Sequence, residues 1–242
     1  MTAIEQHRVA LVTGASRGFG YALITALVLR GWHVIADARD GDRLAAALAR
    51  LTGPGTTTPV AGDVTDPAHR QRIVAEADAR GGLDLLVNNA SVLGPSPQPR
   101  LADYPLDVLA QVLATNTIAP LALVQLALPG LERRAGRIVN VTSDAAVEPY
   151  EGWGGYGSSK AALDQLTNVL AAEHPRLRVY AFDPGDMNTD LHQQAFPGED
   201  ISDRPSPRSV VPALLRLIDH DLPSGRYRAA ELRGIEKSAA SA

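Results

Sequence analysis

The sequence contains no cysteine and only six scattered histidines. Without cysteine, the chain cannot form a disulfide-framed secreted scaffold, a thiolate-ligated zinc or iron–sulfur centre, or a cysteine nucleophile. The histidines alone offer little for metal chemistry, so we expect no bound metal. The absence of cysteine is also compatible with the reducing cytoplasm, where we expect the protein to be located.

The sequence also lacks a strong charge of either sign and a long hydrophobic run. Its 23 basic and 27 acidic residues give a net charge of −4, which provides no general attraction to nucleic acids or anionic lipids. The longest apolar stretches, residues 21–29 and 119–131, are shorter than the roughly 20 residues that span a bilayer. The first residues lack the layout of a secretory signal. We therefore expect a soluble protein with neither a nucleic-acid nor a membrane partner.

Short apolar runs rich in β-branched residues alternate with longer segments of helical period along the chain. Strands are predicted over residues 8–12, 32–37, 57–61, 83–87, 136–141, 178–182 and 226–229. Helices are predicted over residues 19–30, 42–51, 67–80, 105–131 with one interruption, 156–173 and 209–219. This alternation is typical of an α/β fold in which a doubly wound (Rossmann-type), mostly parallel seven-stranded sheet carries helices on both faces. The length of 242 residues fits a single domain over residues 1–242.

Two proline-rich segments, residues 94–99 and 197–207, are predicted to be loops. Both follow predicted strands, and in open α/β sheets ligands bind outside the carboxyl ends of the strands. We therefore expect these segments to flank a binding site, with a substrate loop over about residues 184–207. The last residues, 236–242, are predicted to fray.

A glycine-rich turn follows the first predicted strand. In the segment RVALVTGASRGFG (residues 8–20), Gly14, Gly18 and Gly20 lie between an apolar strand and a helix. Such a turn lets the backbone approach a pyrophosphate, whose charge is stabilised by free N–H groups at the helix start. Two other interpretations remain open: a tight turn without a ligand, and the G-x-S-x-G nucleophile elbow of a hydrolase, with Ser16 as the nucleophile.

A serine, a tyrosine and a lysine form a second candidate cluster. Ser143 ends a predicted strand, and Tyr156 and Lys160 follow at the start of a predicted helix. Residues four apart lie on one face of a helix with Cβ atoms about 5 to 6 Å apart, so the ammonium group of Lys160 can act on the phenol of Tyr156. The alternative is an ordinary surface pair, because an isolated Tyr-x3-Lys is common by chance.

Together these motifs resemble those of the short-chain dehydrogenase/reductase family, and the resemblance covers nearly the whole chain. The matching elements, in order, are TGASRGFG, residues 62–64 (GDV), residues 88–90 (NNA), Asn116, Ser143, the pair Tyr156 and Lys160, and residues 184–189 (PGDMNT). In the family these form the cofactor turn, the adenine contact, a post-strand turn, the catalytic tetrad and the stretch that holds the nicotinamide carboxamide. Seven elements in the expected order make coincidence remote.

The resemblance implies hydride transfer between a nicotinamide cofactor and a ketone or secondary alcohol. Tyr156 would be the general acid or base, and Ser143 would donate a hydrogen bond to the substrate oxygen. Asn116 would hold a water that links Lys160 to solvent, and Lys160 would also hold the nicotinamide ribose. A free phenol has a pKa of about 10, and we expect cationic Lys160 and the oxidised nicotinamide to lower the pKa of Tyr156 toward neutrality.

The resemblance also implies a set of cofactor-binding residues. They are Gly14, Ser16, Arg17, Gly18, Phe19, Gly20, Arg39, Asp63, Val64, Asn89, Ala90, Tyr156, Lys160, Pro184, Gly185, Met187 and Thr189. Arg39, just after the second predicted strand, and Arg17 are suited to the 2′-phosphate of NADP. Asp37 lies two residues before Arg39, and we expect the two to pair. We therefore predict NADP as the cofactor in preference to NAD.

Substrate contacts are expected from the loops that follow the strands. The candidates are Leu93, Asp144, Tyr150, Trp153, Leu191 and Phe196. They indicate a largely apolar pocket, in which Asp144, directly after Ser143, favours a hydroxylated or cationic substrate. Ser91 stands where the family commonly has glycine, and we expect this difference to affect only the local loop.

These observations predict an NADP(H)-dependent, ketoreductase-like enzyme that acts on a small-molecule carbonyl or alcohol. Relatives usually pair through their long helices, so the resemblance also implies a homodimer or homotetramer. Two alternatives remain: a dinucleotide-binding sensor or assembly protein without turnover, and a serine hydrolase that uses Ser16.

Overall fold

A computed structural model describes residues 8–220 and 222–232. Its centre is a seven-stranded sheet in the order β3-β2-β1-β4-β5-β6-β7, and every neighbouring pair of strands is parallel. The strands are β1 (Val9–Val12), β2 (His33–Ala38), β3 (Thr56–Ala61), β4 (Leu85–Asn88), β5 (Arg137–Val141), β6 (Arg178–Asp183) and β7 (Gly225–Arg228). The predicted doubly wound sheet is confirmed. The predicted fraying of residues 236–242 lies outside the described residues.

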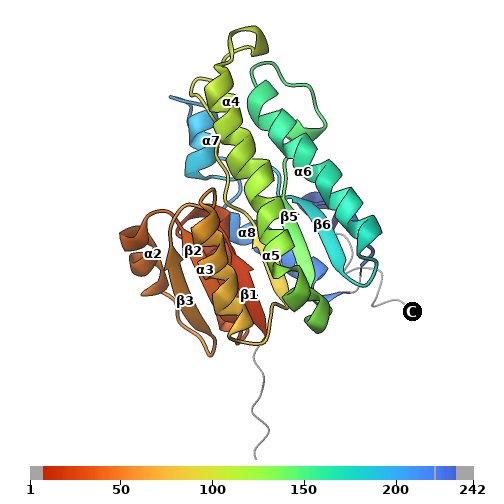
Figure 1. The fold of residues 1–242 in the computed structure, drawn as a ribbon. Coiled ribbons are helices and arrows are strands. Elements are labelled where there is room, and N and C mark those ends of the chain that lie inside the picture. Colours follow the sequence, from red (N-terminus) through yellow and green to blue (C-terminus); the bar gives the residue numbers. More distant parts are fainter. Residues whose placement is uncertain (1–7, 221, 233–242) are drawn as a thin grey trace, which may run out of the picture.

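Helices cover both faces of the sheet (Figure 1). They are α1 (Gly18–Leu29), α2 (Gly41–Leu48), α3 (Pro67–Asp78), α4 (Leu106–Leu113), α5 (Ala119–Arg134), α6 (Gly154–Glu173), α7 (Asp190–Ala195), α8 (Pro207–Asp219) and α9 (Ala229–Leu232). Side chains of α3, α5 and α6 pack on one face, and those of α1 and α8 pack on the other. Ala229, predicted as the end of a strand, instead begins α9.

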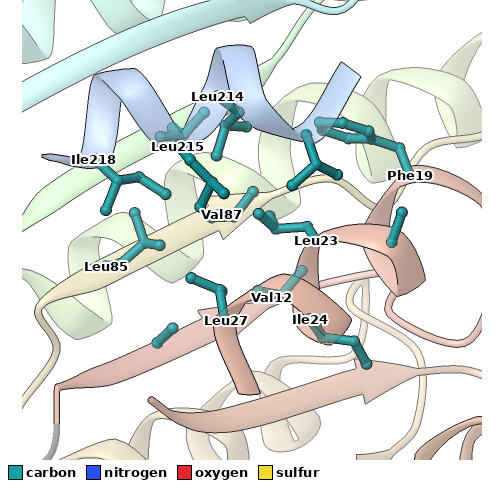
Figure 2. Packing of buried hydrophobic residues seen from close by; sticks show 14 of the residues in the cluster. Val12, Phe19, Leu23, Ile24, Leu27, Leu85, Val87, Leu214, Leu215 and Ile218 are labelled. Atoms are coloured by element: carbon teal, nitrogen blue, oxygen red, sulfur yellow. The ribbon is translucent and has the colours of Figure 1, made fainter. Parts of the chain in front are cut away.

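The core between α1, α8 and the sheet fixes the start of α1 relative to β1. Leu23 and Leu27 of α1 and Leu214 of α8 are fully buried against β1 and β4 (Figure 2). Truncation of one such leucine to alanine typically lowers stability by about 2 to 5 kcal/mol. This packing holds the turn between β1 and α1 in place.

A long helix runs over residues 106–134 and consists of α4, a π-helical turn (Ala114–Ile118) and α5. Among the described residues, it alone has the length and mean hydropathy (1.5) to cross a membrane. Its longest apolar run, residues 119–131, is shorter than the roughly 20 residues that span a bilayer. In the structure this helix contacts α3 and α6 (Figure 1), and its inner face belongs to the core. Its apolar residues therefore serve, at least in part, to cover the sheet.

The strand order places a topological switch point between β1 and β4. The chain winds from β1 through β2 to β3 on one side, and from β4 to β7 on the other. In such sheets the carboxyl ends of the two central strands open a crevice where ligands bind. The fold therefore predicts a site beside residues that follow β1 and β4.

Candidate active site

A cavity of about 670 Å³ lies at the carboxyl ends of β1 to β6. Its walls come from the turn between β1 and α1, the segments that follow the other five strands, and side chains of α2, the π-helical turn, α6 and α7. Cavities of this size are typical of small-molecule and cofactor sites. The motifs that the sequence presents one by one therefore line a single space.

The glycine-rich turn forms one end of this cavity. Gly14 (φ 66°) and Gly18 (φ 55°) adopt the left-handed backbone that glycine favours. A Cβ atom on Gly20 would collide with the carbonyl oxygen of Gly14 and lie 2.6 Å from Nδ2 of Asn89. Arg17 is the residue before α1, and its side chain accepts no hydrogen bond from the start of the helix. The first N–H groups of α1 can therefore bind an anion. The turn therefore fits a dinucleotide pyrophosphate.

The structure brings nearly all of the predicted cofactor residues together. The cavity is lined by Gly14, Ser16, Arg17, Gly18, Phe19, Arg39, Asp63, Val64, Asn89, Ala90, Tyr156, Lys160, Pro184, Gly185, Met187 and Thr189. Gly20 does not line the cavity, because it lies beneath the turn. Asn89 also supports the turn from below, since its Nδ2 donates to the carbonyl oxygen of Thr13 at 2.8 Å.

The expected pairing of Asp37 with Arg39 is wrong. Asp37 is buried, and its Oδ1 lies 2.6 Å from Nε2 of His69 in α3. Because Arg72 donates to Nδ1 of His69 at 3.0 Å, the proton of a neutral ring lies on Nε2 and is donated to Asp37. Burial raises the pKa of Asp37, and the hydrogen bond from His69 opposes this rise. Arg39 follows the end of β2 and is exposed at the edge of the cavity.

Asp63 lines the cavity after β3. Its Oδ1 accepts two hydrogen bonds from Thr65, one from the backbone N–H at 2.8 Å and one from the hydroxyl at 2.7 Å. Partial burial raises the pKa of Asp63, but these bonds and the charge of Arg39 outweigh burial and hold the pKa below its usual value. Asp63 is therefore a carboxylate acceptor, suited to an amino group such as that of adenine.

Arg17 and Arg43 share one carboxylate at the same end of the cavity. Nη1 of Arg17 bonds to Oδ2 of Asp190, and Nη1 of Arg43 lies 3.9 Å from the same oxygen. All three side chains are exposed, so solvent weakens these ion pairs. Asp190 begins α7, and the contacts therefore connect the glycine turn to the predicted substrate segment.

Ser143, Tyr156 and Lys160 meet at the other end of the cavity. Ser143 follows β5 and caps a short 3-10 turn (Asp144–Ala146). Tyr156 and Lys160 are buried one turn apart in α6, and Nζ of Lys160 lies 5.5 Å from the centre of the Tyr156 ring. The four-residue spacing thus places amine and phenol together, beside the serine that follows β5.

Burial dominates the protonation of both groups. It raises the pKa of Tyr156 to about 12, and hydrogen bonds with Ser91 and Ser143 offset part of this rise. Burial lowers the pKa of Lys160 to about 8, although the carboxylate of Asp164 opposes this change. Lys160 is not among the main causes of the Tyr156 shift, and the expected lowering of this pKa by Lys160 together with the oxidised nicotinamide stays a prediction. Nζ of Lys160 donates instead to the carbonyl oxygen of Val141 at 2.8 Å.

Asn116 lies in the π-helical turn between α4 and α5, a geometry often found at functional sites. It is fully buried and does not line the cavity. Its Oδ1 accepts hydrogen bonds from the N–H of Val92 at 2.9 Å and the hydroxyl of Ser91 at 3.2 Å. Its Nδ2 donates to the hydroxyl of Ser159 in α6 at 3.0 Å. Asn116 therefore fixes the segment after β4 against α6.

The expectation that Ser91 affects only its own loop is wrong. Its hydroxyl forms a hydrogen bond with the hydroxyl of Tyr156 as well as with Asn116. A serine at this position thus links the fully buried asparagine to the phenol. The sequence signal was present, because Ser91 replaces a residue that has no side chain in most relatives.

Four of the six predicted substrate residues line the cavity. They are Leu93, Asp144, Trp153 and Leu191. Tyr150 and Phe196 do not line it. Their rings instead contact that of Trp153, with centroid distances of 6.3 and 6.0 Å. Tyr150 also donates to Asp144, and Phe196 also contacts the ring of His192, so both act on the cavity through residues that line it.

The segment 184–207, predicted to be a loop, contains the six-residue helix α7. The hydroxyl of Thr189 accepts a hydrogen bond from the N–H of His192 at 3.2 Å and caps this helix. His192 lines the cavity next to Leu191. The helix therefore presents side chains to the same space as Tyr156.

Two residues that sequence reasoning missed support the site from the side of β6 and β7. Asp183 ends β6 and lines the cavity. Arg226 in β7 donates from Nη2 to Oδ2 of Asp183 and to the carbonyl oxygen of Ser143, both at 3.0 Å. Its Nε donates to Asp164 in α6 at 3.1 Å. The only signal in the sequence was a charged residue, Arg226, within a short predicted strand. Its partners lie far away in the sequence, so no local pattern indicates them.

Known proteins share both the sequence pattern and the fold. The sequence profile of the short chain dehydrogenase family matches residues 8–200. The chain belongs to the short-chain dehydrogenase/reductase family. It is 35% identical to sepiapterin reductase from Mus musculus over 204 residues, which cover 77% of each protein.

Two solved structures of this family have the same fold. A short chain dehydrogenase from Pseudomonas syringae superimposes with a TM-score of 0.86 and 29% identity, over 92% of this chain and 94% of that one. A second, from Shigella flexneri and complexed with NADP, gives a TM-score of 0.83 and 27% identity, over 92% and 97% of the two chains. The protein is therefore an oxidoreductase by family. Within residues 8–220 and 222–232, no cluster of side chains could hold a metal ion.

Proposed function

We propose that the protein is an NADP(H)-dependent oxidoreductase that interconverts a ketone and a secondary alcohol, with ketone reduction as the direction in cells. The observation that carries this proposal is that Ser143, Tyr156 and Lys160 share one cavity with the glycine turn. Dinucleotide binding alone requires no phenol buried beside an amine. The family to which the chain belongs supports the same class of reaction.

Each of the three residues has a chemical role in reduction. The nicotinamide, when bound, supplies the hydride. Tyr156 donates its proton to the carbonyl oxygen, where negative charge develops, and Ser143 donates a hydrogen bond to the same oxygen. A pKa of about 12 keeps Tyr156 protonated at neutral pH, as a general acid requires. Lys160, with a pKa of about 8, is mostly cationic at pH 7 and stabilises the phenolate that remains.

We propose NADP rather than NAD because cations gather where β2 ends. Arg17, Arg39 and Arg43 line this part of the cavity. Ala38 occupies the position where a carboxylate would bind the ribose hydroxyls of NAD. The NADP complex of the Shigella flexneri relative supports the same choice. At least tenfold higher kcat/KM with NADH than with NADPH would contradict it.

The proposed activity is tested by following NADPH oxidation with aromatic, aliphatic and polyketide-like ketones. The wild-type protein is expected to reduce at least one class. The Tyr156→Phe variant should be slower by about 100-fold or more, because a positioned acid typically contributes that much, and it should still bind NADPH. Ser158→Ala is the matched control, since Ser158 is exposed in the same turn of α6 and should be dispensable.

Two other results would replace this proposal. Tight NADPH binding without turnover of any ketone would indicate a sensor or assembly protein. Labelling of Ser16 by a covalent serine probe would indicate a hydrolase. The structure does not favour the hydrolase, because within the described residues no hydrogen bond joins Ser16 to any of its candidate histidines, His69, His174, His192 and His220. His69 in α3 is instead buried against Asp37.

We also propose that the protein is a homodimer or homotetramer in the cytoplasm, without a nucleic-acid or membrane partner. Ile118, Leu126 and Val169 of the long helices are 59%, 39% and 42% exposed, and association through these helices would remove them from water. Sedimentation is expected to show an oligomer for the wild-type protein and a monomer for the Leu126→Glu, Val169→Glu variant. A wild-type monomer would contradict the proposal.

A further inference from the structure

Asp144, which follows the proposed hydrogen-bond donor Ser143, competes with a substrate for the hydroxyl proton of Ser143. The hydroxyl of Ser143 donates to Oδ1 of Asp144 at 2.9 Å. The N–H of Ala145 also donates to Oδ1 at 2.9 Å, and the hydroxyl of Tyr150 donates to Oδ2 at 3.0 Å. A serine hydroxyl has one proton. While Asp144 accepts this proton, Ser143 cannot donate it to a substrate oxygen.

A second polar group lines the same cavity. The His192 side chain is only 10% exposed, and its Nε2 has no hydrogen-bond partner within the described part of the chain. A buried polar atom without a partner is costly, so a ligand with a polar group would complete this side of the cavity.

The remaining wall near Tyr156 is apolar. Leu93, Trp153 and Leu191 pack together beside the phenol and line the cavity. A ligand in this position therefore needs an apolar or aromatic body that contacts these side chains, and a donor group that reaches Asp144. These two requirements define a class of substrate.

We propose that the substrate carries a hydroxyl or ammonium group on the carbon next to the reacting carbon, and that Asp144 binds this group. The inference rests on the proposed ketone and alcohol chemistry. The oxygen of Ser143 and Oδ1 of Asp144 are 2.9 Å apart, which matches the separation of about 3 Å between heteroatoms on neighbouring carbons in a gauche arrangement. The reacting oxygen can thus face Ser143 while its neighbour faces Asp144.

Binding of this donor group releases the proton of Ser143. Asp144 then accepts from the substrate, and the serine hydroxyl turns toward the reacting oxygen. In alcohol oxidation, the carbinol hydrogen leaves with its electron pair to NADP⁺, the hydroxyl proton passes to the phenolate of Tyr156, and the products are the ketone and NADPH. Ser143 and Asp144 change hydrogen bonds only. Asp144 is therefore a specificity residue that favours substrates with a neighbouring donor.

The test compares three alcohols that share one aromatic body: 1-phenylethanol, 1-phenylethane-1,2-diol and 2-amino-1-phenylethanol. Oxidation is followed as NADPH formation at pH 8 with saturating NADP⁺. The wild-type enzyme is expected to prefer the amino alcohol over 1-phenylethanol by about tenfold or more in kcat/KM, since a hydrogen bond to a charged group has that effect. The kcat/KM for the diol is expected to lie between the values for the other two alcohols.

The Asp144→Asn variant keeps the size of the side chain and removes its charge. It is expected to lose most of the preference for the amino alcohol and to retain turnover of 1-phenylethanol, because an amide attracts an ammonium group less strongly than a carboxylate does. A purely structural role of Asp144 would lower all three values together. Glu148→Gln is the matched control, since Glu148 is exposed on the same segment, and the preference should persist in it.

Equal kcat/KM values for the three alcohols in the wild-type enzyme would overturn the inference and leave the proposed function intact. So would a preference that survives in a folded Asp144→Asn variant that binds NADP⁺. Absence of any turnover, with these alcohols and with the ketone panel, would overturn the proposed function itself. The wild-type comparison requires no variant, so the test remains decisive if Asp144→Asn does not fold.

Discussion

Lys160, which we propose takes part in catalysis, is expected to lower the stability of the folded protein. Burial lowers its pKa from 10.5 to about 8. This lowering of the pKa corresponds to a penalty of roughly 3 kcal/mol for the buried ammonium group, at about 1.36 kcal/mol per pKa unit. Between these two pKa values the unfolded chain binds the proton more strongly than the folded protein does, so stability rises with pH in this interval. The penalty is complete below pH 8 and disappears as the pH passes about 10.5.

Replacement of Lys160 by methionine tests this reasoning, because methionine keeps an unbranched apolar side chain without the amine. The variant loses the hydrogen bond to the carbonyl oxygen of Val141, at a cost of about 1 to 2 kcal/mol. We therefore expect Lys160→Met to be more stable than the wild-type protein by roughly 1 to 2 kcal/mol at pH 7. At pH 10 the order should reverse, since the lysine is then neutral in the folded protein.

Urea denaturation of both proteins at pH 7 and pH 10 measures this change in order. Lys237→Met is the control for the loss of a lysine as such, since Lys160 and Lys237 are the two lysines in the sequence. The control is expected to match the wild-type protein at both pH values. A Lys160→Met variant that is less stable by the same amount at pH 7 and pH 10 would refute the argument that burial penalises the ammonium group.

Four further outcomes follow from the same structure. The kcat/KM for ketone reduction should be level at low pH and fall above about pH 8 as Lys160 loses its proton; a profile level to pH 10 would contradict this. Gly20→Ala should weaken NADPH binding by about tenfold or more in a fluorescence titration, because its Cβ would collide with the glycine turn. Arg39→Ala should lower kcat/KM with NADPH by about tenfold and change that with NADH less than threefold, since only NADPH carries the 2′-phosphate. His69→Leu should lower the free energy of unfolding by about 3 to 5 kcal/mol because it leaves Asp37 buried without its partner, and a second change, Asp37→Val, should restore most of it.

The sequence predicted the sheet well because a parallel strand that is buried on both faces reads as a short, continuous apolar run. It predicted α7 poorly. This helix has six residues between proline-containing segments, and too few turns exist for a 3.6-residue pattern to appear. Its formation depends on a cap from Thr189, which is a local hydrogen bond rather than a pattern of apolar residues.

In the candidate site, the sequence predicted the geometry within one helix correctly, but it did not indicate a contact between residues far apart in sequence. The spacing of Tyr156 and Lys160 correctly placed both groups on one helix face, because that geometry is local. The pairing of Asp37 failed for a physical reason. Residues two apart share a face only while the strand continues, and β2 ends at Ala38, so Arg39 turns toward solvent while Asp37 faces α3. Its partner, His69, is 32 residues away and no spacing rule connects them.

The pKa of Tyr156 follows from the same long-range assembly. The residues that act on it come from different elements: Ser91 after β4, Ser143 and Asp144 after β5, and Asp183 at the end of β6. The two carboxylates raise the pKa and the two hydroxyls lower it.

Cations and carboxylates are mixed along the cavity rather than sorted to its two ends. Arg17 and Arg43 lie at the glycine turn with Asp190, and Asp144 and Asp183 lie beside Tyr156 with Lys160. Because Arg17 and Arg43 share the carboxylate of Asp190, a phosphate that binds at this end must compete with that carboxylate for the two cations. Beside the phenol, Asp144 and Asp183 raise the pKa of Tyr156, so they oppose formation of the phenolate until further positive charge arrives.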